Sequence, residues 1–135
     1  MKRRLAGTAM LVLFCINLAG CGAVAAVLGL AAVSAGTYVY VEGKLKRDYN
    51  VPLDRAYVAS LEALQDLRIT IDEKKKDLSE ADINARDGEK SVWVRLDALD
   101  KDKTLISVRV GYTGDEQASK RIHEAIAKRL GVQGT

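Results

Sequence analysis

The sequence predicts an α+β domain in which an antiparallel sheet of about five strands carries two helices on one face. Two observations carry this prediction. Four segments alternate apolar and polar residues with a period of two, which is typical of strands with one buried and one solvated face. Two longer segments, one before and one after these strands, repeat apolar residues at helical spacing. The expected order over residues 37–131 is therefore β-α-β-β-β-β-α.

The domain is expected to begin with a strand and a helix. Residues 38–41 are β-branched or aromatic, and this extended character runs on towards Tyr49. Pro52 suits the first turn of a helix of about 14 residues, and Asp54 stands where the helix dipole favours negative charge. The side chains expected along its apolar side are Tyr57, Val58, Leu61, Leu64 and Leu67.

Four strands are expected next, separated by turn-like residues. Their inward-facing side chains are Ile69 and Ile71, then Ala81, Ile83 and Ala85, then Val92, Val94 and Leu96, and finally Ile106, Val108 and Val110. The turns are expected at residues 75–77, 87–89 and 100–102. Of these, Asp87-Gly88 is the strongest hairpin signal.

The last element is expected to be a helix from about Asp115 to Leu130. Acidic residues in its first turn and basic residues in its last turn complement the helix dipole. Gly131 is well placed to end it. The resulting order is similar to the helix-grip arrangement, a similarity of fold that by itself assigns no function.

The start of the chain has the features of a processed leader. A basic start at residues 2–4 precedes an uncharged, mostly apolar run from Leu5 to Leu18. The stretch Leu18-Ala19-Gly20-Cys21 resembles the lipobox of bacterial lipoproteins. This implies a signal peptide over residues 1–20, cleavage before Cys21, and acyl chains such as palmitate on that cysteine. The alternative is a signal anchor that happens to contain a cysteine.

Residues 21–36 are expected to be a Gly/Ala-rich apolar tether or a membrane-associated segment. Gly22, Gly29 and Gly36 recur every seven positions, and such small residues let helices approach closely in lipid. Two interpretations therefore stay open, a tether or surface helix and a self-associating helix. Residues 132–135 are expected to be a short tail.

The charge balance argues against nucleic acid as a partner. The chain has 21 basic and 18 acidic side chains, and three of the basic ones lie in residues 1–20, so the processed chain would carry 18 of each. A balanced chain has no overall field to steer it toward nucleic acid, whose binding needs a basic face. Cys15 would leave with the leader and Cys21 would carry lipid, so no thiol would remain for a disulfide, a metal or catalysis.

No pattern of residues indicates an enzyme. His123, the only histidine, is expected to be a half-exposed surface residue and not a general base. One histidine without a free cysteine does not make a usual zinc site. Asp97, Asp100 and Asp102 are interrupted by lysines and are expected to form a solvated turn, not a calcium site. We therefore expect a non-catalytic protein with no metal and no cofactor.

Trp93 is the one residue that breaks the alternation, because it stands on the polar face of its strand. If the last two strands pair in the expected register, Trp93 lies opposite Arg109, where a ring and a guanidinium form a cation–π contact. The alternative is that Trp93, with Tyr38 or Tyr40 beside it, forms a contact patch for a partner protein. Trp93 and Arg109 are therefore the candidate contact residues.

Two segments carry a resemblance to a known family. Residues 40–55 (YVEGKLKRDYNVPLDR) and residues 108–116, which contain RVG followed by GDE, resemble a family of small bacterial lipoproteins catalogued only as a domain of unknown function. Together with the lipobox, the resemblance covers nearly the whole chain. It implies a location and a fold, and it brings no activity and no catalytic residues with it.

These inferences predict an envelope lipoprotein with a structural or interaction role. Membrane lipid would be its partner through acylated Cys21, with an unidentified envelope protein as a possible second partner. Gly22 stands where an aspartate would mark inner-membrane retention, so the outer membrane, facing the periplasm, is the expected location. The alternatives are a binding module for a small apolar ligand or lipid, held between sheet and helices, and a membrane-associated protein that oligomerises through its Gly/Ala-rich segment.

Overall fold

Six strands and two helices make up residues 33–132, the part of the chain that the computed structural model describes. The elements are β1 (Val39–Val41), β2 (Lys44–Tyr49), α2 (Leu53–Asp66), β3 (Thr70–Lys76), β4 (Glu80–Asp87), β5 (Lys90–Asp100), β6 (Lys103–Val110) and α3 (Glu116–Leu130). The predicted α+β class and the predicted order are confirmed, with one strand more than expected. Within these residues no helix is both long and apolar enough to cross a membrane.

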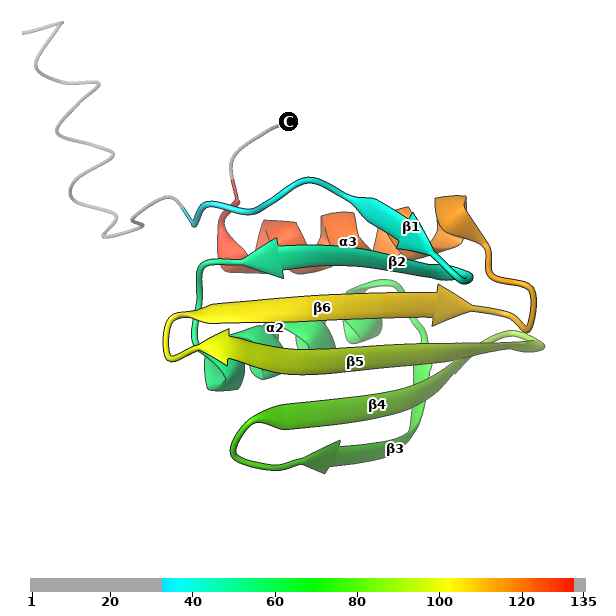
Figure 1. Ribbon diagram of the computed structural model, residues 1–135. Helices are drawn as coiled ribbons and strands as arrows, with labels where there is room; N and C mark the ends of the chain where they lie inside the picture. The colour runs from blue at the N-terminus through cyan, green and yellow to red at the C-terminus, as the bar shows by residue number, and fades with distance from the viewer. Residues whose placement is uncertain (1–32, 133–135) are drawn as a thin grey trace, which may run out of the picture. The chain divides into compact units, whose positions relative to one another are not determined.

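The strands form a single antiparallel sheet in the order β1-β2-β6-β5-β4-β3 (Figure 1). Both helices lie on one face of this sheet, α3 against β2 and β6, and α2 mainly against β5. The long strands β4, β5 and β6 are joined by tight turns at residues 88–89 and 101–102, where the sequence predicts two of its three turns. The third turn lies at residues 77–79, slightly later than expected, because β3 continues to Lys76.

The first predicted strand is a hairpin of two strands. β1 pairs with β2, and the chain reverses at Glu42 and Gly43, whose φ angles are 52° and 77°. Positive φ at both central residues is the geometry of the tight turn that best matches the twist of hairpin strands. Glu42 is unusual in this position, where Asn or Asp is favoured, so Gly43 is the one turn signal at this point of the sequence, and the turn was missed.

The apolar side of α2 differs from the prediction in one respect. Val58 is 52% exposed, whereas the buried positions are mainly small ones. The buried residues of the helix are Leu53, Ala56, Ala59, Ser60, Ala63 and Leu64. The prediction followed the largest apolar side chains, but alanines let the helix approach the sheet closely, so the alanine stripe faces inward.

The helix α3 confirms its prediction at both ends. The side chain of Asp115 caps its start by accepting a hydrogen bond from the backbone N–H of Ala118 at 3.0 Å. This bond and the ammonium of Lys90 lower the pKa of the Asp115 carboxyl below its usual value. Gly131 ends the helix in the left-handed conformation, with φ of 75°.

The inward-facing residues of the sheet and the helices form one continuous core. All the predicted inward positions of β4, β5 and β6 are buried. From α3 the core receives Ile122, Ile126 and Leu130, and from β2 it receives Tyr49. Burial of these side chains on one face of the sheet is the main source of stability in a domain of this size.

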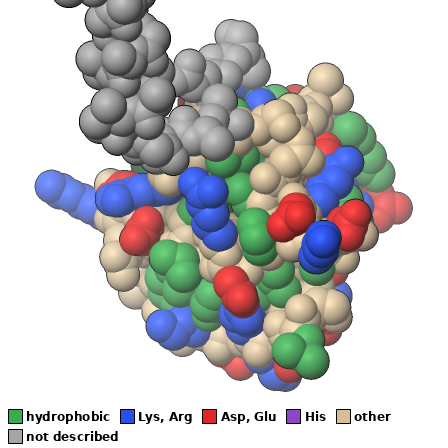
Figure 2. Space-filling view, turned by 90° about the vertical axis from the view of Figure 1, so that its left-hand side faces the viewer, with side chains coloured by type: hydrophobic (Ala, Val, Ile, Leu, Met, Phe, Trp, Pro, Cys, Tyr) green, Lys and Arg blue, Asp and Glu red, His purple; other side chains and the backbone are tan. Residues whose placement is uncertain are grey.

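The packed domain begins at Val33, before the predicted start at residue 37. Val33 is buried in the core, and Ala35 forms an isolated bridge with Tyr49 of β2. Figure 2 views the end of the domain at which the chain enters, where hydrophobic, basic and acidic side chains are interspersed.

Gly36 is part of this domain. Its N–H donates to the carbonyl of Asp48 at 2.9 Å, and a Cβ added at this position would collide with the Asp48 side chain. A glycine is therefore needed at position 36 because of its close packing against β2. Its role is structural, so it is removed from the seven-residue repeat of small residues that the sequence suggested with Gly22 and Gly29. The expected signal peptide, Cys21, the Gly/Ala-rich segment up to residue 32 and the tail beyond Val132 lie outside the described residues.

Candidate functional site

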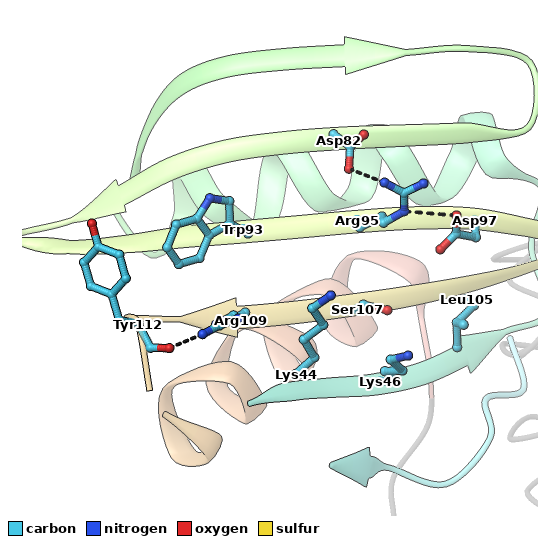
Figure 3. Close-up of a pocket in the computed structure, with 10 residues that line it drawn as sticks. All are labelled: Lys44, Lys46, Asp82, Trp93, Arg95, Asp97, Leu105, Ser107, Arg109 and Tyr112. Carbon is cyan, nitrogen blue, oxygen red and sulfur yellow. Dashed lines mark hydrogen bonds and ion pairs between the residues drawn. The ribbon is translucent and has the colours of Figure 1, made fainter. Parts of the chain in front are cut away.

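The face of the sheet opposite the helices carries a shallow depression of about 590 Å³ (Figure 3). Ser107 lies at its centre on β6, paired with Lys46 of β2 on one side and with Arg95 of β5 on the other. The depression forms because this small side chain is surrounded by long ones. The lining residues are Lys44, Lys46, Asp82, Trp93, Arg95, Asp97, Leu105, Ser107, Arg109 and Tyr112.

The strand register brings together the two residues that the sequence singled out. β5 and β6 pair with Leu96 opposite Ile106 and with Trp93 opposite Arg109, as predicted. The guanidinium carbon of Arg109 lies 5.8 Å from the centre of the Trp93 ring, within the range of a cation–π contact. Both side chains are partly exposed, so this contact contributes about 0.5–1 kcal/mol to stability.

Tyr112 is the aromatic neighbour of Trp93. The two ring centres are 6.2 Å apart with the planes at 65°, an edge-to-face arrangement. Arg109 steadies this pair, because its guanidinium donates to the carbonyls of Gly111, at 3.3 Å, and of Tyr112. Arg109 therefore holds the turn after β6 in a conformation that brings Tyr112 beside Trp93 (Figure 3).

The expectation that Tyr38 or Tyr40 lies beside Trp93 is wrong. Tyr40 pairs with the buried Leu45, so it shares the helix-covered side of the sheet. Tyr38 lies on that side too, with its ring 5.5 Å from the ring of His123. The sequence did not reveal the β1–β2 turn, and without that turn the side of the sheet on which these tyrosines lie could not be assigned.

The charges in the depression are arranged unevenly. At one end the guanidinium of Arg95 is 2.8 Å from Glu80, 3.3 Å from Asp97 and 3.5 Å from Asp82. Chiefly through Asp82 and Asp97, these carboxylates raise the pKa of Arg95.

The other end is cationic and aromatic. Lys44, Lys46 and Arg109 have no acidic partner within residues 33–132. Arg109 and Lys44 lie at the end with Trp93 and Tyr112, and Lys46 lies nearer the centre, paired with Ser107 (Figure 3). Cations without carboxylate partners attract an anionic ligand, and exposed aromatic rings supply an apolar contact surface. The arrangement is suited to binding, and it contains no nucleophile paired with a base.

His123 is fully buried, so the expectation of a half-exposed surface residue is wrong. Its Nε2 lies 2.8 Å from the carbonyl of Leu45, which only accepts, so Nε2 carries the proton. Nδ1 then accepts from the hydroxyl of Tyr49 at 2.9 Å. Burial lowers the pKa of His123 to about 4, and the same burial raises the pKa of Tyr49 above its ordinary value. With both ring nitrogens engaged, His123 connects α3 to β2.

Arg47 anchors the segment that leads into β1. This buried side chain donates to the carbonyl of Gly36 at 2.8 Å and to the hydroxyl of Tyr38 at 3.0 Å. Its guanidinium carbon also lies 4.5 Å from the centre of the Tyr38 ring. The contacts that surround Arg47 are those of a structural residue.

No three side chains of the metal-ligating types His, Cys, Asp and Glu lie close enough to share an ion in the part of the chain that the structure describes. Asp97 pairs with Arg95 on the strand, while Asp100 ends β5 and Asp102 lies in the β5–β6 turn. Nothing in the depression therefore identifies a cofactor that these residues would hold.

Fold and site together define a small α+β domain that covers one face of its sheet with helices and leaves the other open. The chain belongs to the family described as "Protein of unknown function (DUF3568)", which matches residues 5–129. This confirms the resemblance to a family of unknown function. No curated protein matches the chain.

The two segments that carried the resemblance meet in the fold. Gly43, in the β1–β2 turn, packs against Gly114, in the turn before α3. A Cβ added at Gly114 would lie 2.5 Å from the Cα of Gly43 and 2.8 Å from the hydroxyl of Tyr40. The close approach of two backbones explains why glycine stands at both positions.

Proposed function

We propose that the protein is a lipid-anchored envelope protein whose domain is a non-catalytic interaction module. We further propose that the depression on the outer face, the side of the sheet opposite the helices, binds an acidic segment of a partner protein. The observation that carries the proposal is that one depression holds Trp93 and Tyr112 together with three cations that lack acidic partners within residues 33–132. Tryptophan, tyrosine and arginine are the residue types that dominate binding energy at protein interfaces. Complementary charge would steer an acidic partner to this face.

The proposed anchor is lipid on Cys21. A basic start, an apolar run and a lipobox-like stretch support it, and the family match begins at residue 5, so the apolar run and the lipobox-like stretch lie within the matched region. Two or more acyl chains hold a protein stably on a bilayer, whereas one chain alone holds it only marginally. Gly22 after the lipidated cysteine supports the outer membrane as the location, with the domain in the periplasm.

The packing of the core favours this interaction role over a ligand held between sheet and helices. Ala81 and Ala85 are buried within the continuous core, and the inward side of α2 is largely alanine. These small residues support close contact between helix and sheet, and the depression that the structure describes on the sheet lies on the other face.

The anchor is tested by feeding radioactive palmitate to cells that express the full chain. The wild-type protein should be labelled, and a Cys21→Ser variant should lose the label. An unlabelled wild-type protein, or a mature form that still begins at Met1, would contradict the proposal.

The interaction surface is tested by crosslinking in intact cells through a photoreactive amino acid at Tyr112, which is 84% exposed. Crosslinked neighbours should be lost in a variant that combines Trp93→Ala with Lys46→Glu. The matched control is Lys74→Glu, an exposed lysine on the edge strand β3. If the double variant captures the same neighbours as the wild type, the proposal that the depression is a contact site is contradicted.

A further inference from the structure

One end of the sheet is marked by a row of residues that crosses five chain segments. Ala35 bridges Tyr49, Tyr49 pairs with Thr104, and Thr104 pairs with Ala98. The N–H of Ala98 then donates to the carbonyl of Ser79 at 2.8 Å. The chain enters the domain at this end, because Ala35 follows directly after the first described residues.

Two exposed leucines lie at the same end. Leu78 is next to Ser79 and is 99% exposed, and Leu99 is next to Ala98 and is 54% exposed. Because Ser79 and Ala98 are hydrogen-bonded to each other, the two leucines extend from neighbouring positions of the sheet end. Figure 2 views this end, where hydrophobic side chains are exposed between charged ones. A leucine at the tip of a hairpin has no role in the core of its own domain.

We propose that Leu78 and Leu99 form a membrane-contact site, which touches the boundary between headgroups and hydrocarbon in the bilayer that holds the lipid anchor. The inference rests on the proposed lipidation of Cys21. Cys21 precedes Val33 by 12 residues, which span at most about 40 Å in any conformation. The leucines therefore lie at the end of the domain where the anchored chain enters.

The charged side chains around the two leucines neither oppose nor drive contact with the bilayer. Residues 76–80 and 100–103 form the two hairpin ends, and their one surplus acid, Glu80, is paired with Arg95 at 2.8 Å. The other charges balance, with three basic and three acidic side chains, which are Lys76, Lys101, Lys103, Asp77, Asp100 and Asp102. With no net charge the contact is apolar in character, so it should change little with ionic strength. Lysine side chains next to a bilayer can also lay their apolar stems on it while the ammonium stays in water.

Two leucines alone would bind a bilayer weakly, and the anchor makes the weak contact effective. Once lipid holds the chain, contact between the leucines and the bilayer is intramolecular, and its effective concentration is set by the short connecting segment. Apolar side chains at the acyl boundary gain in proportion to the area that they bury.

The contact would also orient the domain. Trp93 lies six residues before Leu99 on β5, a distance of about 20 Å along an extended strand. Tyr112 follows the end of β6 that lies away from the row of residues. With the leucines on the bilayer, the end of the depression that holds Trp93 and Tyr112 is kept away from the membrane and open to a partner.

The test uses the mature, acylated protein, purified from the cells that express it and placed in vesicles of phosphatidylethanolamine and phosphatidylglycerol. With Cys21 acylated and Cys15 removed, an introduced cysteine is the sole free thiol. A spin label is placed in turn at Leu78→Cys, at Leu99→Cys and at Glu89→Cys. Glu89 is the matched control, since it is an exposed residue of the β4–β5 turn, at the opposite end of the sheet.

The labels at positions 78 and 99 should collide several-fold more often with oxygen, relative to a water-soluble nickel complex, than the label at position 89. Equal ratios at all three positions, on protein that floats with the vesicles, would overturn the membrane-contact site and leave the anchor standing. Protein that fails to float would overturn both. Labels that stay immobilised in detergent would overturn the inference too, since a second copy of the chain would then cover the leucines.

Discussion

The Nδ1 atom of His123 lies 2.9 Å from the hydroxyl oxygen of Tyr49, at a site where neither side chain is reached by solvent. The two residues are 74 positions apart in the chain and join the last helix to the second strand. Burial lowers the pKa of His123 to about 4, so the imidazole is neutral at pH 7, and since Nε2 donates to the carbonyl of Leu45 it is in a single tautomer. This pair is the main polar connection that fastens α3 to the sheet.

Tyr49→Phe is expected to destabilise the domain by about 1–3 kcal/mol, because it leaves the buried Nδ1 of His123 without a donor while the ring still fills its place. Urea unfolding at pH 7.5 measures the change in unfolding free energy. Tyr57→Phe is the matched control, a half-buried tyrosine of α2 whose hydroxyl has no partner among the hydrogen bonds of residues 33–132; it should cost less than about 0.5 kcal/mol. Equal effects of the two substitutions would contradict the assigned hydrogen bond.

The stability of the domain is expected to fall between pH 6.5 and pH 4 because of His123. Burial lowers the pKa of His123 from 6.5 to about 4, so in this interval the unfolded chain takes up a proton that the folded chain excludes. Above pH 6.5 neither state is protonated and the group has no effect. The full loss amounts to about 3 kcal/mol, at about 1.4 kcal/mol for each pH unit.

The pH dependence can be assigned to one residue, because His123 is the only histidine. Asp66 and Asp115 have pKa values below the ordinary 3.8, so what they contribute to stability is lost only under more acidic conditions. Urea unfolding at several pH values should therefore give a clearly smaller slope between pH 6.5 and 5 for His123→Gln than for the wild type. A slope that the substitution leaves unchanged would show that other groups cause it.

Much of the fold could be predicted from local patterns. The alternation in β4, β5 and β6 fixed which residues face inward, and through the register it placed Trp93 opposite Arg109. The ends of α3 could be predicted because capping residues and helix dipoles act over a few neighbouring residues.

The remaining features depend on contacts between distant segments. His123 could not be recognised as buried, because its partners Tyr49 and Leu45 belong to β2. Tyr112 was missed as part of the candidate site, because it lies in a turn beyond the alternating pattern and is brought to Trp93 by the hydrogen bonds of Arg109. The one feature of the sequence that could have indicated Tyr112 is its position shortly after the strand that carries Arg109.

Gly114→Ala is expected to destabilise the domain by about 2–5 kcal/mol. Gly114 has φ of 81°, which costs any other residue about 1–2 kcal/mol, and the added Cβ would lie 2.5 Å from the Cα of Gly43, which adds overpacking of about 1–3 kcal/mol. Gly88→Ala is the matched control, with φ of 63° and nothing within 4 Å of the added Cβ. Thermal or urea unfolding should show the larger loss for Gly114, and equal losses would mean that the two turns do not touch.

Arg109→Met is expected to change the fluorescence of Trp93 while it alters the unfolding free energy by no more than about 1 kcal/mol. Trp93 is the only tryptophan, so its emission reports on this site alone. Removal of the guanidinium ends the cation–π contact and frees the turn that holds Tyr112. Arg121→Met, in which the lost partner is Asp87, is the control and should leave the emission unchanged. Identical emission spectra for the wild type and Arg109→Met would show that Arg109 does not contact Trp93.

Ser119→Ala is expected to stabilise the domain by about 1 kcal/mol. Among the described residues Ser119 is fully buried on α3, and its Oγ has no hydrogen-bond partner. A buried hydroxyl without a partner keeps its desolvation cost, and alanine is the better helix former, so both effects have the same sign. Ser60→Ala on α2 is the matched comparison, because the Ser60 hydroxyl donates to the carbonyl of Ala56 at 2.8 Å and its loss should bring no gain. If urea unfolding shows Ser119→Ala to be destabilising, then the hydroxyl is engaged in the folded protein, and the N-terminal turn of α3 packs differently from the arrangement described.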